Sequence, residues 1–177
     1  FSTNRAPGGG GSWVIRYTGA GNPATNVEAD ILVIAGGGGG TGGGTVDASC
    51  HGQTTTSSGQ AYRTGVGNWG GTAATAGAGG NAGNASVNGA GAGFLTNGQN
   101  GSGGTRGDNL AGGMCWLSGV LGGAVNASYS PNGGGFGGGG SPNNGNLSRY
   151  AGGGGYSGGA SSNTGTSNNV NDPGFSG

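Results

Sequence analysis

Glycine tracts recur along almost the whole chain and limit its fold more than any other feature. Glycine makes up 54 of the 177 residues, against a usual share of roughly 7%. A glycine inside an α-helix costs about 1 kcal/mol relative to alanine, and almost no window of the sequence lacks one. A helical fold is therefore excluded. A collagen triple helix is excluded too, because the chain has 5 prolines and no unbroken Gly-X-Y period.

Apolar residues gather in short segments, which favours an ordered glycine-rich scaffold over a disordered chain. Residues 13–17 alternate in the way that predicts a half-buried strand, with Trp13, Ile15 and Tyr17 on one face. Residues 31–35 form a continuous apolar run bounded by glycine, which predicts a strand buried on both faces. We expect the two strands to pair.

The chain from residue 36 to about residue 160 is mostly glycine with small and polar residues. We expect this part to form a bundle of packed polyglycine II helices, left-handed with three residues per turn, whose backbone groups bond to neighbouring helices. A period of three is present in one stretch. Small residues occupy Gly71, Ala74, Gly77, Gly80, Gly83, Ser86, Gly89 and Ala92.

One glycine-rich domain, residues 1–177, accounts for the whole sequence. We expect a flexible N-terminal segment or intersubunit arm over 1–12, a strand pair over 13–35, the glycine-helix bundle over 36–160 and a loose tail over 160–177. Within the bundle, residues 110–121 predict a short helical turn or a packed apolar plug. Met114, Leu117, Val120 and Leu121 would supply its core contacts.

The charge balance argues against two classes of partner. Five arginines and five acids give a net charge of zero, and lysine is absent. Nucleic acids and anionic membranes both require a basic surface, so neither is expected. The sequence has no apolar run near 18 residues and starts at Phe1, which predicts no membrane insertion and a processed or trimmed soluble product. Low net charge also favours self-association.

No motif predicts catalysis, a cofactor or a metal site. Gly37, Gly39 and Gly42 satisfy a dinucleotide-binding spacing, but the residues after them cannot start the helix that would receive a pyrophosphate. A phosphate loop needs the lysine that the chain lacks. The single histidine, His51, directly follows Cys50, a spacing unsuited to a nucleophile and its base. We therefore expect a protein that is not an enzyme.

The two cysteines, Cys50 and Cys115, form no metal-binding pattern and are candidates for one disulfide, which would favour an oxidising compartment. An adhesion candidate is the tripeptide Arg106-Gly107-Asp108, which could equally be a solvated ion pair in a loop. Four aromatic residues standing between polar or glycine segments could stack on sugars, seal one protomer against another, or cap the glycine bundle. They are Tyr129, Phe136, Tyr150 and Tyr156.

The order of motifs suggests a family. The segments GGGGSWVIRY, DILVIAGGGGG, GAGFLTNG, GGGFGGGGS and AGGGGYSGG follow one another between residues 8 and 160. This series resembles the glycine-rich domain of the anaplastic lymphoma kinase and leukocyte tyrosine kinase receptor ectodomains and of bacterial surface proteins. It is also similar in architecture to glycine-rich phage tail adhesins. The resemblance implies an extracellular fold in which a few β-strands support hexagonally packed polyglycine II helices, without catalytic residues.

These observations predict a non-enzymatic, extracellular or cell-surface structural and adhesive protein that self-associates as a subunit of a filament or fibre. Open strand edges would make the contacts between subunits. The intersubunit candidates are Trp13, Ile15, Tyr17, Ile31 and Val33. The alternative is a monomeric recognition module that binds cell-surface glycans or proteins. Neither function requires a cofactor.

Overall fold

The computed structural model describes residues 5–17, 30–40, 51–53, 71–72, 74–82, 88–101, 111–124, 133–140, 149–163 and 177. Within these ranges most of the chain is irregular and no α-helix is present. The regular elements are a two-stranded antiparallel sheet, one 3-10 turn and three strands of two residues each. The expected irregular and β structure with almost no α-helix is confirmed at this level.

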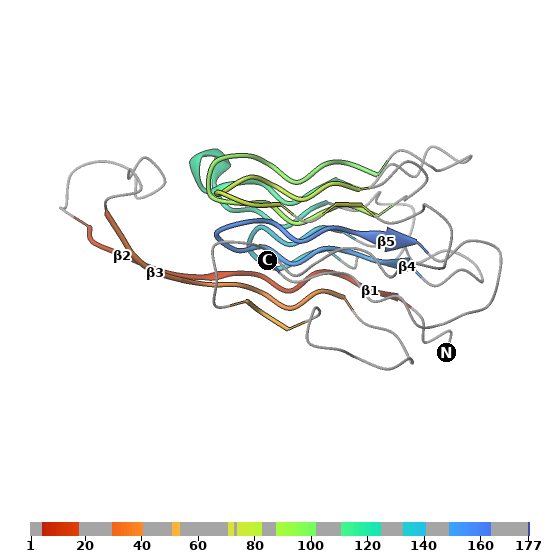
Figure 1. Cartoon of the computed structure of the whole chain (residues 1–177), viewed down its shortest axis with the longest axis horizontal. Helices are drawn as coiled ribbons and strands as arrows, with labels where there is room; N and C mark the ends of the chain where they lie inside the picture. Colours follow the sequence, from red (N-terminus) through yellow and green to blue (C-terminus); the bar gives the residue numbers. More distant parts are fainter. Residues whose placement is uncertain are drawn as a thin grey trace.

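The two predicted strands form a hairpin. Strands β2 (Ser12–Ile15) and β3 (Ile31–Ala35) are antiparallel, with Val14 opposite Val33. The register shifts by a bulge next to Val14. Figure 1 shows that this hairpin projects beyond the rest of the molecule. The predicted pairing of the two strands is therefore confirmed.

Three very short strands lie at the opposite end of the molecule (Figure 1). Strand β4 (Arg149–Tyr150) is in the middle, with β1 (Arg5–Ala6) parallel to it on one side and β5 (Ser162–Asn163) antiparallel on the other. We call this region the sheet end. It is separated from the β2–β3 hairpin by the full length of the glycine segments.

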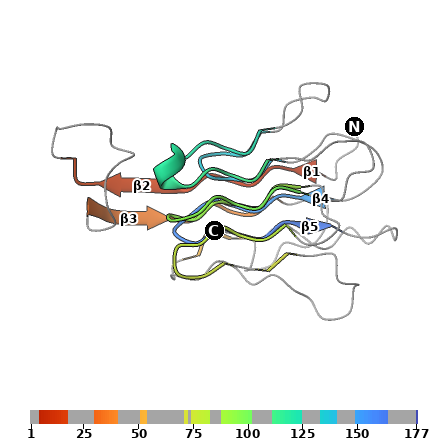
Figure 2. The same cartoon turned by 90° about the horizontal axis from the view of Figure 1, so that it is seen from above.

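The glycine segments run side by side in stacked layers along the long axis (Figures 1 and 2). Backbone hydrogen bonds join segments that are far apart in sequence, and residues 89–92 lie among the most densely bonded. Their N–H groups donate, in chain order, to the carbonyls of Gly140, Gln99, Gly159 and Gly137. Their carbonyls accept, in chain order, from the N–H groups of Gly152, Gly113, Gly80 and Gly155.

Two regularities follow from the hydrogen bonds of residues 89–92, the central segment. The first and fourth residues donate to the same neighbour, residues 137–140, and accept from the same neighbour, residues 152–155. The pattern therefore repeats every three residues. The partners belong to six different stretches of chain, so the central segment is surrounded on all sides by backbone rather than by side chains.

Glycine is required here because neighbouring backbones leave no room for a side chain. A Cβ atom built on Gly91 would fall inside the carbonyl group of Gly153, and one built on Gly113 would fall inside that of Gly137. Both acceptors belong to the backbone and cannot rotate away. Along the predicted period of three, all the described residues are buried, whereas Gly83 and Ser86 lie outside the described part. These buried residues are Gly71, Ala74, Gly77, Gly80, Gly89 and Ala92.

Tight turns close the glycine segments at the hairpin end of the bundle (Figure 1). One is the 3-10 turn η4 (Trp116–Ser118), which confirms the short helical turn expected within residues 110–121. Gly119 follows it in a left-handed conformation with φ of 99°. Backbone bonds join neighbouring turns, for example from Leu95 N–H to Gly77 O at 2.8 Å and from Phe94 N–H to Tyr156 O at 2.8 Å.

Two expectations about burial are wrong in detail. Strand β3 is not buried on both faces, since Leu32 and Val33 are 54% and 56% exposed. The reason is that β3 belongs to a two-stranded hairpin that leaves the bundle, so one of its faces meets solvent. In the 110–121 segment Val120 is buried, but Leu117 and Leu121 are more than half exposed because the turn directs them outward.

The glycine packing makes a testable prediction. Gly91→Ala should lower the free energy of unfolding by about 3 kcal/mol, because the new methyl group displaces backbone that holds the central segment. Thermal unfolding followed by calorimetry should then show a melting temperature lower by roughly 6–12 °C. The control is Gly133→Ala, where the nearest atom to a new Cβ lies at 3.7 Å. Equal melting temperatures for the two variants would contradict the packing described here.

Candidate functional site

Exposed apolar side chains gather at one end of the bundle. Among the described residues every large hydrophobic residue with high exposure lies on the β2–β3 hairpin or on a turn beside it. These residues, which we call the apolar end, are Val14, Tyr17, Leu32, Val33, Leu95, Leu117, Leu121 and Phe136. The most exposed is Phe136, at 65%. No such residue is found along the described sides of the bundle.

A small aromatic core holds the hairpin on the bundle. Phe94, Trp116 and Val120 are buried together, and Trp13 and Ile15 pack against them from the inner face of the hairpin. Further contacts come from Ile31 and Tyr156. The stacked rings of Trp13 and Trp116 have centroids 4.9 Å apart, and those of Trp13 and Phe94 are 6.2 Å apart. The hairpin is therefore anchored by ring packing on one face and leaves Val14 and Val33 on the other.

Polar side chains cover one side of the bundle by bonding back to the backbone. In the segment 96–100 every residue except Gly98 is exposed, and its polar side chains replace the carbonyl groups that a further neighbouring segment would supply. Asn97 Oδ1 accepts from Cys115 N–H at 2.7 Å, and Asn100 Oδ1 accepts from Gly112 N–H at 2.9 Å. Thr96 and Gln99 accept in the same way from Gly79 and Ala82. This side is thus closed to additional glycine segments.

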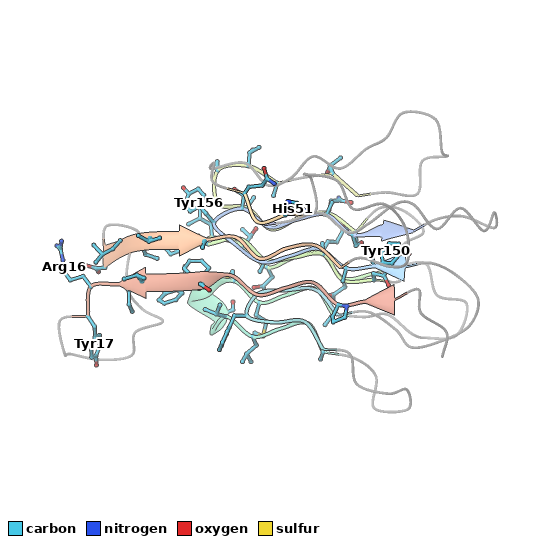
Figure 3. All side chains as sticks on the ribbon, turned by 90° about the horizontal axis from the view of Figure 1, so that it is seen from below. Arg16, Tyr17, His51, Tyr150 and Tyr156 are labelled. Atoms are coloured by element: carbon cyan, nitrogen blue, oxygen red, sulfur yellow. The ribbon has the colours of Figure 1, made fainter. Side chains whose placement is uncertain are left out.

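Among the described residues, the sheet end contains several buried polar groups. Asn88 is fully buried and its Nδ2 donates to the carbonyl of Tyr150 at 3.3 Å. The hydroxyl of Ser161 donates to the carbonyls of Ala82 and Asn88. Figure 3 shows Tyr150 at this end, with Arg16 and Tyr17 at the far tip of the hairpin. The two ends of the molecule therefore differ in chemistry.

Four connecting segments, residues 83–87, 102–110, 125–132 and 141–148, lie outside the described part, and the described stretches that flank them end at the sheet end (Figure 1). The adhesion candidate Arg106-Gly107-Asp108 and the contact aromatic Tyr129 belong to these segments. The predictions for these residues therefore lie outside the described residues.

The other predicted site residues fall into three groups. Trp13, Ile15 and Ile31 of the intersubunit set pack on the aromatic core, whereas Tyr17 and Val33 are exposed. Among the contact aromatics, Phe136 is exposed and Tyr150 is buried. Tyr156 lies against Phe94, with ring centroids 6.4 Å apart. From the expected loose tail, Ala160 and Ser161 are buried and Gly177 N–H donates to Gly37 O at 3.0 Å.

Only one of the two cysteines of the predicted disulfide lies in the described part of the chain. Cys115 is a buried free thiol whose S–H donates to Ser118 Oγ at 3.3 Å. Cys50 lies outside the described residues, and no disulfide is found in the part that the structure describes. A pairing of these two cysteines stays a prediction.

Side chains that could bind a metal are not clustered in the described ranges: no group of three or more His, Cys, Asp or Glu comes together there. His51 is exposed at the side of the bundle (Figure 3). The described residues also include no helix long and apolar enough to cross a bilayer.

Comparisons of the chain with protein-family models, with curated proteins and with solved structures found no match.

Sequence reasoning missed several residues of the apolar end. Leu95, Leu117 and Leu121 each directly follow a large residue that is buried, namely Phe94, Trp116 and Val120. Periodicity assigned Leu117 and Leu121 to a core and did not single out Leu95. The available signal was two adjacent large residues at a turn. Only one of such a pair can pack on the small core, as Phe94 and Trp116 do, and its neighbour is left exposed.

Removing one ring of the aromatic core should destabilise the packing that holds the hairpin on the bundle. Trp116→Ala should lower the free energy of unfolding by about 3–5 kcal/mol, because Trp116 stacks on Trp13 and is buried. The neighbouring Leu117→Ala should change it by less than about 1 kcal/mol, since Leu117 is 57% exposed. Calorimetric unfolding of both variants measures the difference. The comparison is made at a protein concentration low enough to keep the chain monomeric. Equal losses of stability for the two variants under these conditions would contradict the described core.

Proposed function

We propose that this chain is a non-enzymatic, extracellular structural and adhesive module that self-associates. The observation that carries the proposal is the collection of exposed apolar side chains at one end of a bundle bonded through its backbone. Such a bundle keeps its ends a fixed distance apart, and an exposed apolar surface of this kind marks an interaction site. Contact between copies at that surface is the function we infer for it.

We infer further that the glycine segments are polyglycine II helices. Two features of the central segment support this assignment: the hydrogen-bond pattern repeats every three residues, and six stretches of chain surround it. Three residues per turn is the repeat of this helix type. Hexagonal packing gives each helix six neighbours, which is the arrangement that the resemblance to the receptor and bacterial surface domains implies. Membership of that family is part of the proposal and rests on the order of the motifs.

Self-association is tested by the mass and shape of the native, non-reduced protein. Light scattering should give assemblies heavier than the 16.3 kDa chain, and negative-stain images of the same sample should show one repeating particle. Filaments would mean that a second contact surface exists besides the apolar end. A monomer at every concentration would contradict the proposed function.

Recognition of a cell-surface glycan or protein is the second candidate function. It is favoured by the four connections whose flanking residues all lie at the sheet end, because separate binding segments would there face one target. In this alternative a monomer suffices. The apolar end would then attach the module to whatever carries it.

The adhesion tripeptide gives this second candidate a direct test. Asp108→Ala should weaken binding of the labelled protein to cells or to a glycan array by about tenfold or more, because a carboxylate in a charge-assisted contact is lost. Asp30→Ala, at the other end of the molecule, is the matched control and should leave binding unchanged. Equal binding of the two variants would remove the tripeptide from the recognition surface.

A further inference from the structure

We propose that the apolar end binds the apolar end of a second copy, so that two bundles join end to end through their β2–β3 hairpins. The inference rests on the self-association proposed above and names the surface and the partner. It starts from the outer face of the hairpin. Val14 and Val33 are cross-strand partners on this face and are 53% and 56% exposed, with Leu32 beside them at the bulge.

The size of the apolar end fits one half of a stable interface. Eight large side chains are each about half exposed. If a large side chain offers roughly 150 Å² when fully exposed, the apolar surface is on the order of 600 Å² in area. Stable complexes bury about 800 Å² on each partner, and the largest apolar patch of a typical monomer is roughly 300–600 Å². Backbone and half-buried side chains of the hairpin supply the remaining area.

The edges of the hairpin offer hydrogen bonds to the same partner. Among the described residues β2 and β3 each have one neighbouring strand, so each leaves one edge without a sheet partner. A two-stranded hairpin is marginally stable in water, and an open edge pairs readily with another strand. Figure 2 shows the hairpin reaching past the bundle.

Surface chemistry favours a second copy over contact along the sides. The segment from β2 to β3 contains three charged residues, Arg16, Glu28 and Asp30, so each hairpin has a net charge of only −1 and two copies repel each other weakly. Along the side, the polar residues of segment 96–100 already bond the backbone groups that another bundle would need. The apolar end is therefore the surface where identical copies gain most.

The expected assembly is a closed pair. A surface that binds its own copy forms a two-fold, self-complementary interface, which uses both apolar ends and stops at two chains. The two sheet ends then point away from the contact.

The test compares two lysine variants by sedimentation equilibrium. Wild-type protein should approach about twice 16.3 kDa. Val33→Lys should weaken the pair by about tenfold or more, because it places like charges in a dry apolar contact. Thr72→Lys, on an exposed threonine of the bundle side, should assemble as the wild type does. Unchanged melting of the Val33→Lys protein under dilute conditions would show that it is folded.

Hydrogen exchange on the wild-type protein provides an independent measurement. Raising the protein concentration should slow exchange of the amides in 13–15 and 31–34 and leave those of segment 96–100 unchanged. If the Val33→Lys protein still assembles and the hairpin amides show no slowing of exchange, the proposed surface is overturned while self-association stands. A wild-type protein that stays monomeric at all concentrations would overturn both the proposed surface and the proposed self-association. That outcome includes the case in which a different protein covers the apolar end.

Discussion

The structure depends on one constraint: backbone N–H and C=O groups buried away from water must be hydrogen-bonded. Helices and sheets meet this need within one segment or between two strands. In the central segment it is met by six surrounding stretches of chain. Close approach of so many backbones is incompatible with side chains, and Gly91 shows this because a methyl group there would occupy a neighbouring carbonyl. Glycine content is thus the condition for this core.

A core of this kind displaces large side chains to its ends. Phe94, Trp116 and Trp13 form a small aromatic cluster where the turns meet the hairpin, and apolar residues beyond it are exposed. At the sheet end the described residues include the buried polar side chains of Asn88 and Ser161. The proposed functions concern contact and support because the exposed apolar side chains lie at one end of a bundle bonded through its backbone.

The positions of the strands could be predicted from the sequence better than the burial and the neighbours of each segment. Alternation in residues 13–17 predicted correctly that Trp13 and Ile15 share the packed face, and the apolar run at 31–35 predicted a strand that pairs with it. The prediction that this second strand is buried on both faces was wrong, because a short apolar run has the same sequence pattern whether its outer face meets the core or the solvent. The partners of each glycine could not be predicted, since identical residues carry no information about which segments become neighbours.

A backbone core also has a thermal consequence. The heat-capacity increase on unfolding comes from exposing apolar surface, whereas exposure of polar groups lowers it. In this bundle the buried middle is mostly peptide backbone, and burial of large apolar side chains is limited to the cluster around Phe94 and Trp116 and to Tyr150. The heat-capacity change per residue is therefore smaller than in a protein with an ordinary side-chain core. Stability then varies little with temperature, and the fold resists unfolding in the cold as well as in the heat.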